Sequence, residues 1–259
     1  MMFARLSRLS RLSRLPGGPA RNAFQASALV AVLALAACAS PSSRFYTLGG
    51  ASVGASGSTP AGASSVRTAA APAWLIEVAP IDVPPQVAKT QLVVQTGPTQ
   101  VKVLEEERWA SLPGDELRRA LSTSLTQQLN TIDVYGTAYS DTTPVYRVSV
   151  NVQRFESWPG SHALIDAVWS VRAVRSTAVM TCRSVVSEQV GSGYDSLVDG
   201  HRRALQRVSE QVAGALRAMA ASSASAGAAA AGASSSQAKG AARENVPACP
   251  SDGAAVAAG

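Results

Sequence analysis

Two stretches of alternating apolar and polar residues constrain the fold of this chain most. Residues 146–153 and residues 163–171 each place an apolar side chain at nearly every second position. Successive side chains of a strand point to opposite faces, so each pattern predicts a strand with one buried and one wet face. The link between them, Trp158-Pro159-Gly160-Ser161, is typical of a tight turn. The two strands are therefore predicted to pair antiparallel.

The remaining elements are shorter or weaker in pattern. Strands are predicted at 75–83, 91–103 and 181–190. Leucines recur every four residues from Leu117 to Leu129 after Pro113 and Asp115, which suit the start of a helix. A second apolar stripe from Tyr194 to Met219 predicts a helix packed on a sheet, with a coiled-coil seam as the alternative. The fold class is α+β, with one antiparallel-dominated sheet and two main helices on one face. Trp109 and Trp169 are both expected to be buried.

Two low-complexity stretches delimit the folded part. Residues 49–73 are rich in Gly, Ala, Ser and Thr and read as a flexible insertion. Residues 220–259 are rich in Ala and Ser, lack an apolar stripe, and are expected to form a disordered tail that adds little stability. A single α+β domain is therefore predicted over residues 74–219, a normal domain size.

The N-terminal residues predict a compartment. Five arginines precede an apolar run that ends at Leu35-Ala36-Ala37-Cys38. A basic region, a short apolar core and small residues before a cut are typical of a secretory signal, and the last four residues resemble a bacterial lipobox. The prediction is a signal peptide over 1–37 and, over 38–48, a lipidated start at Cys38 followed by a first strand. A mitochondrial transit peptide and an ordinary signal peptide are the alternatives.

The charge balance argues against nucleic acid as a partner. The whole chain carries 23 Lys and Arg against 17 Asp and Glu, a net charge of +6. Five of the arginines precede Cys38, which leaves 18 − 17 = +1 for the mature chain. A net charge so close to zero lacks the electrostatic footprint of a nucleic-acid-binding protein.

The sequence offers no constellation for catalysis. It contains no serine elbow, phosphate-binding loop or zinc-ligand spacing, and its two histidines, His162 and His201, lie far apart. His201 falls on the apolar helical stripe and is interpreted as a structural histidine. Residues 105–107 are three consecutive glutamates, interpreted as a solvated strand end. The chain is therefore predicted not to be an enzyme and to hold no cofactor or metal.

Cys182 and Cys249 remain once Cys38 is assigned to lipid. Outside the cytoplasm the two could form a disulfide. The alternative is a buried Cys182 with a free Cys249, and the sequence leaves the choice open.

Several short motifs follow one another in a characteristic order. They are the lipobox cysteine, Arg44-Phe45-Tyr46-Thr47-Leu48, Ile76-Glu77-Val78-Ala79-Pro80-Ile81-Asp82-Val83-Pro84, Arg108-Trp109-Ala110-Ser111-Leu112, residues 146–155, and a last helix containing His201. In this order the chain resembles the ABC-type transport auxiliary lipoproteins, the PqiC/YmbA-like family, over residues 44–219.

The resemblance implies an outer-membrane lipoprotein that faces the periplasm. It implies partners as well, an MCE-domain protein with its ABC permease and ATPase, in a lipid transport system where this chain is a docking subunit. Two other functions stay open: a regulatory lipoprotein that binds and activates a cell-wall synthase, and a periplasmic lipid-carrying domain. The number of copies is open too, a homo-oligomer included.

A partner-binding surface is expected around the turn between the two alternating strands. Phe155, Trp158 and His162 are the candidate contact residues, since an aromatic side chain beside Pro159 and Gly160 is hard to bury. The alternative is that Trp158 folds back onto its own sheet.

Overall fold

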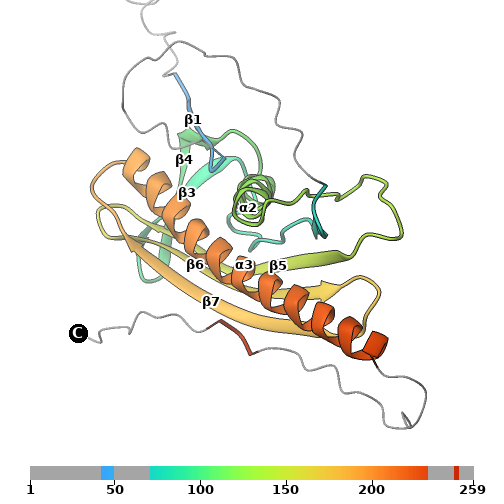
Figure 1. Cartoon of the computed structure of the whole chain (residues 1–259). Coiled ribbons are helices and arrows are strands. Elements are labelled where there is room, and N and C mark those ends of the chain that lie inside the picture. The colour runs from blue at the N-terminus through green and yellow to red at the C-terminus, as the bar shows by residue number, and fades with distance from the viewer. Residues whose placement is uncertain (1–41, 50–70, 233–247, 251–259) are drawn as a thin grey trace, which may run out of the picture. The chain divides into compact units, whose positions relative to one another are not determined.

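The computed structural model describes residues 42–49, 71–232 and 248–250. Cys38, the predicted signal peptide and most of the predicted 49–73 insertion lie outside the described residues. The elements in chain order are β1 (Arg44–Tyr46), β2 (Leu75–Val78), β3 (Gln91–Gly97), β4 (Gln100–Trp109), α2 (Pro113–Leu129), β5 (Val145–Trp158), β6 (His162–Ala173), β7 (Val179–Gln189) and α3 (Tyr194–Gly232). The order of helices and strands confirms the α+β class (Figure 1).

The strands form two sheets instead of the single sheet expected. One has the order β1-β4-β3 and the other β2-β5-β6-β7. The extra sheet exists because residues 91–103, predicted as one strand, turn back at residues 98–99 and become the β3–β4 hairpin. Three of the five strand pairings are antiparallel, while β1 runs parallel to β4 and β2 parallel to β5.

The two alternating patterns become the centre of the larger sheet. β5 and β6 pair antiparallel from Tyr146↔Ala173 to Trp158↔His162, with one irregularity between Val152 and Arg154. The turn between them needs Gly160, whose φ of 70° lies in the left-handed region that favours glycine. The prediction of a hairpin here is confirmed.

The residues at both ends of helix α2 suit a helix start and a helix end. Pro113 stands at its first turn, where a missing N–H costs nothing, and Asp115 and Glu116 complement the positive end of the helix dipole. Its last turn closes at Asn130, which adopts a left-handed conformation (φ 48°). The predicted leucine stripe faces the core, and Leu117, Leu121 and Leu125 are all at most 1% exposed.

Helix α3 lies over one face of the larger sheet, against β6 and β7, and also contacts α2 (Figure 1). The stripe predicted from Tyr194 to Met219 is therefore a sheet-packing surface. The helix does not stop at Met219 but runs on to Gly232, so the start of the predicted tail at residue 220 is wrong. Alanine, the strongest helix former, accounts for the extension through a segment with no apolar stripe.

One core connects both sheets and both helices. Trp109 and Trp169 are each 2% exposed, as predicted. Trp109 comes from β4 in the smaller sheet, and its ring meets the ring of Phe155 from β5 edge-on at a centroid distance of 6.0 Å. Trp169 lies on the helix-facing side of β6, and its indole N–H donates to Ser184 Oγ at 2.7 Å.

A disulfide between Cys182 and Cys249 fastens the C-terminal residues to β7. The neighbouring Pro250 lies near helix α3, since a Cβ built on Gly214 would stand 3.7 Å from its ring. The structure decides the alternative that the sequence left open, and Cys249 is not a free thiol.

Candidate functional site

The segment Arg44–Leu48 begins six residues after Cys38 and is held by three charged side chains from distant parts of the chain. We call these five residues, together with Glu107, Glu116 and Arg202, the anchor clamp. β1 opens the segment and runs parallel to β4, and the Tyr46 carbonyl accepts a hydrogen bond from the Ala110 N–H at 2.7 Å.

Glu107 of β4 holds the first half of the segment. Its carboxylate accepts hydrogen bonds from the Arg44 guanidinium, at 3.0 Å from Nε, and from the Tyr46 hydroxyl at 2.6 Å. Burial acts to raise the pKa of Glu107, but the bonds from Arg44 and Tyr46 outweigh it and hold that pKa below its usual value. Burial, with the bond to Glu107, also raises the pKa of the Tyr46 hydroxyl. The glutamate run is thus not wholly solvated, because Glu107 is only 7% exposed.

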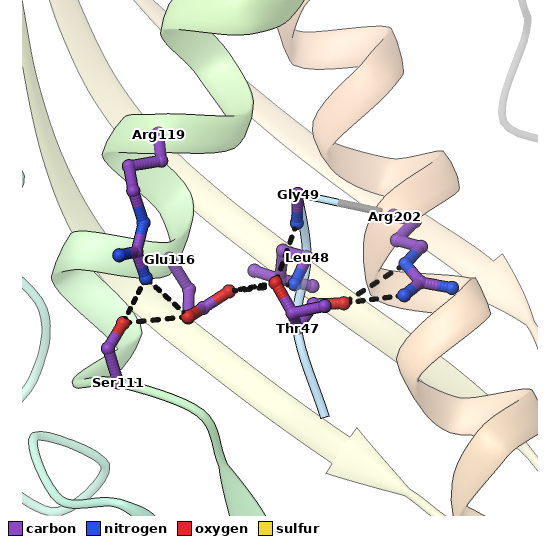
Figure 2. A network of polar contacts seen from close by, with 7 residues as sticks. All are labelled: Thr47, Leu48, Gly49, Ser111, Glu116, Arg119 and Arg202. Atoms are coloured by element: carbon purple, nitrogen blue, oxygen red, sulfur yellow. Dashed lines mark hydrogen bonds and ion pairs between the residues drawn. The ribbon is translucent and has the colours of Figure 1, made fainter. Parts of the chain in front are cut away.

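Glu116 of α2 holds the second half (Figure 2). One carboxylate oxygen accepts from the Thr47 hydroxyl at 2.7 Å and from the Leu48 N–H at 2.9 Å. The other accepts from the Ser111 hydroxyl at 2.7 Å and from the Arg119 guanidinium at 2.5 Å. The side chain is 1% exposed. Burial acts to raise the pKa of Glu116, and these bonds reverse the effect, so its pKa lies below the usual value and the carboxylate stays ionised.

Arg202 of α3 completes the clamp. Its guanidinium donates two hydrogen bonds to the Thr47 carbonyl, at 3.1 and 2.6 Å (Figure 2). It also pairs with Asp199 at 2.8 Å. The anchor clamp therefore joins the segment nearest Cys38 to β4, α2 and α3 at once. Sequence reasoning missed all three holding residues. The sequence carried no signal for Glu107, while Glu116 and Arg202 were marked only by their places beside the apolar stripes that begin at Leu117 and Tyr194.

A groove of about 470 Å³ opens beside the anchor clamp. It is lined on one side by Arg44, Phe45, Tyr46 and Thr47, and on the other by Asp195, Val198, Asp199 and Arg202. The second set recurs at helical spacing over the first turns of α3. The groove carries two arginines and two aspartates, so its formal charges cancel.

The three residues predicted to bind a partner do not form one surface. Phe155 lies in β5, not in a loop, and is 3% exposed because its ring stacks on His201 at 4.1 Å. Its assignment as a surface contact is wrong. Trp158 and His162 end β5 and begin β6, are half-buried, and stack with centroids 5.7 Å apart. The Trp158 indole donates to Glu156 at 3.0 Å.

His201 is buried completely, as the apolar stripe predicted, but only one of its nitrogens is paired. Nε2 lies 2.8 Å from the Ser157 hydroxyl, whereas Nδ1 has no hydrogen-bond partner in the described part of the chain. The Phe155 and Trp109 rings lie against the imidazole. Burial lowers the pKa of His201 to about 3, so the ring is neutral at ordinary pH.

Stability should consequently fall as the pH drops below about 6.5. Between the unfolded value of 6.5 and the folded value of about 3, the unfolded chain binds a proton that the folded chain does not. The free energy of unfolding then decreases by up to about 1.4 kcal/mol per pH unit. Glu107 and Glu116 have lowered pKa values, so their contribution to stability is lost only below the ordinary glutamate pKa of 4.5. Urea unfolding measured between pH 7 and roughly pH 5 therefore isolates the contribution of His201 to the pH dependence of stability.

The control for this measurement is the second histidine. His201→Gln should flatten the stability profile above about pH 5, while His162→Gln, at a half-exposed position, should leave it as in the parent chain. A parent chain equally stable at both ends of this pH range would contradict the burial argument.

The described residues hold neither a membrane-spanning helix nor a cluster of metal-binding side chains. No helix there combines the length and the apolar content needed to cross a bilayer. The same residues contain no group of three or more His, Cys, Asp or Glu side chains placed to hold a metal ion.

Comparisons with a family model and with solved structures identify relatives of the chain. The model of the family described as ABC-type transport auxiliary lipoprotein component matches residues 58–213. A crystal structure of an uncharacterized protein superposes with a TM-score of 0.51 at 18% identity, over 67% of this chain and 97% of that one. A crystal structure from Xanthomonas campestris, of the family model DUF330, covers 56% of this chain and 85% of its own at 20% identity and a TM-score of 0.44. No curated protein matches.

The two kinds of comparison carry different weight. At 18% identity the first crystal structure supports the fold alone, and the second superposes too loosely to add to it. The family model spans more than half of the chain, from residue 58 into the last helix, and so covers the motifs from Ile76 onwards. This chain therefore belongs to the ABC-type transport auxiliary lipoprotein component family.

Proposed function

We propose that the chain is an outer-membrane lipoprotein, facing the periplasm, that docks the other components of an MCE-type ABC lipid transport system. In this proposal Cys38 carries the lipid, and an MCE-domain protein with its permease and ATPase are the partners. The chain has no phosphate-binding loop, so ATP hydrolysis falls to the separate ATPase. Its own role is to bind and position.

The anchor clamp is the observation that carries this proposal. A lipoprotein whose lipid merely kept it near a membrane would need no ordered contacts close to the lipidated cysteine. Here the segment that begins six residues after Cys38 is bonded to β4, α2 and α3. Membrane attachment is thereby coupled to the orientation of the whole domain, which is what a docking subunit between a membrane and a protein partner requires.

Trp158 and His162 are the proposed contact residues for the protein partner. Their stacked rings lie at the β5–β6 turn and are half-exposed. Aromatic side chains with a polar rim, here Glu156 and Arg154, are the composition of binding hot spots.

Crosslinking in cells tests the docking role. A photoreactive amino acid at position 158 is expected to capture the MCE-domain protein, and the same probe at Val185, an exposed position in β7, should capture it much less. A cell-wall synthase in the adduct would replace the proposal with the regulatory alternative. Phospholipid as the sole adduct would favour the lipid-carrying alternative.

The lipid anchor has its own test. Cys38→Ser should abolish palmitate labelling and leave the signal peptide uncleaved by the lipoprotein peptidase. Ala39 follows the cysteine, with no aspartate there to retain the protein in the inner membrane, so the parent chain should fractionate with the outer membrane. Recovery of the labelled parent chain in the inner-membrane fraction would contradict the proposed location.

A further inference from the structure

Phe45 is a large aromatic side chain that is exposed to solvent, although it lies in the middle of the anchor clamp. Its two neighbours in β1, Arg44 and Tyr46, both bond Glu107. Adjacent strand residues point to opposite faces, so the Phe45 ring points away from that carboxylate. It is 66% exposed, the highest value among the exposed large apolar side chains of the described residues. The contacts that hold β1 in place come from its neighbours, so the ring is available for a contact outside the domain.

The distance to the lipidated cysteine limits what that contact can be. Phe45 lies seven positions after Cys38, and a fully extended chain covers at most about 3.6 Å per residue. The ring therefore stays within roughly 25 Å of the membrane surface that holds the acyl chains. A tether this short gives an effective concentration on the order of millimolar, so even a weak apolar contact with that surface is populated.

The charges around Phe45 indicate the kind of surface. Arg44 and Arg202 line the adjoining groove together with Asp195 and Asp199, and the formal charges of the four side chains cancel. A balanced set of charges does not attract an anionic surface selectively, as a cluster of lysines and arginines would. It suits the headgroup layer of a zwitterionic bilayer, where ammonium and phosphate groups alternate.

We propose that β1 is the membrane-contacting edge of this domain and that the Phe45 ring inserts into the interfacial layer of the zwitterionic bilayer carrying the anchor. The inference rests on the proposed acylation of Cys38. Aromatic side chains favour this layer because an apolar ring can leave water there without crossing the membrane. The anchor clamp then fixes the tilt of the domain, since the inserted strand is bonded to β4, α2 and α3.

The test uses the full acylated chain in vesicles of phosphatidylethanolamine and phosphatidylcholine that contain a phospholipid with a photoreactive diazirine in its acyl chain. Trypsin cuts after Arg44 and separates the acylated peptide from the peptide 45–67. After illumination, mass spectrometry should find the phospholipid adduct on peptide 45–67, with fragment ions placing it at Phe45. The matched control is peptide 120–147, which contains Ile132, 55% exposed, and should carry no adduct.

Two variants separate insertion from mere proximity. Phe45→Glu should lower the adduct on peptide 45–67 about tenfold, and Phe45→Leu should retain it. Both should melt like the parent chain, because the ring is exposed. An adduct that is absent, or that is the same in Phe45→Glu, would overturn the inference, provided that the chain floats with the vesicles. A chain that does not float contradicts the anchor itself and removes the inference with it.

Discussion

Replacing Glu116 with alanine is expected to lower the free energy of unfolding by about 3 kcal/mol. The change removes a carboxylate that is 1% exposed and leaves the Leu48 N–H and the hydroxyls of Thr47 and Ser111 without their acceptor. A hydrogen bond to a charged group contributes more than a neutral one, and a buried donor left unpaired costs further free energy. Urea unfolding of the parent and the variant chain measures the difference.

Two further variants sharpen the Glu116 experiment. Glu116→Gln keeps the shape and one good acceptor oxygen, so its loss of stability should be smaller than that of alanine. Glu105→Ala removes a carboxylate whose side chain is 66% exposed and pairs with Arg108 at 3.6 Å, and it should cost less than about 0.5 kcal/mol. If Glu116→Ala unfolded at the same urea concentration as Glu105→Ala, Glu116 would not hold the segment.

Breaking the disulfide is the other change expected to have a large effect. Cys182 and Cys249 are 67 residues apart in sequence, and a crosslink that closes a loop of this length stabilises the folded state by up to about 4 kcal/mol. Cys249→Ser should lower the midpoint of thermal unfolding accordingly. This expected result differs from the prediction that the C-terminal residues add little stability, because that prediction counted the apolar surface of the tail and not the crosslink.

A reductant supplies the control for the disulfide. Dithiothreitol should destabilise the parent chain to the level of Cys249→Ser and leave that variant unchanged. Equal unfolding of the oxidised and the reduced parent chain would show that the crosslink contributes nothing to stability.

Local patterns accounted for most of the elements, whereas the pairings that were missed came from contacts between distant residues. The alternation at 146–153 predicted β5 because side-chain period is a local property of a strand. The turn at Pro98 and Thr99 between β3 and β4 follows Gly97, so a turn signal was present and would have divided the strand predicted at 91–103. The parallel pairing of β1 with β4 has no such signal, because it joins residues 63 apart.

The candidate site was predictable only in part. The motif order drew attention to Arg44–Leu48, but nothing local distinguishes a glutamate that will bury itself against that segment, such as Glu116, from a solvated one such as Glu105. Phe155 was misplaced for a related reason. Its neighbour Trp158 stands beside a turn, whereas Phe155 faces His201, a residue 46 positions later whose proximity only the folded chain reveals.

Contacts within the folded domain fix both ends of the connection between Leu48 and Leu75. Leu48 is bonded to Glu116, and Leu75 is paired with Val145, so the folded domain itself sets the distance to be spanned. The entropy of closing a loop between fixed points grows only with the logarithm of its length, about 0.6 kcal/mol for each doubling. A chain of this family can therefore lengthen or shorten its sequence here almost without thermodynamic penalty, while a single residue added inside Arg44–Leu48 would displace every bond of the anchor clamp that follows it.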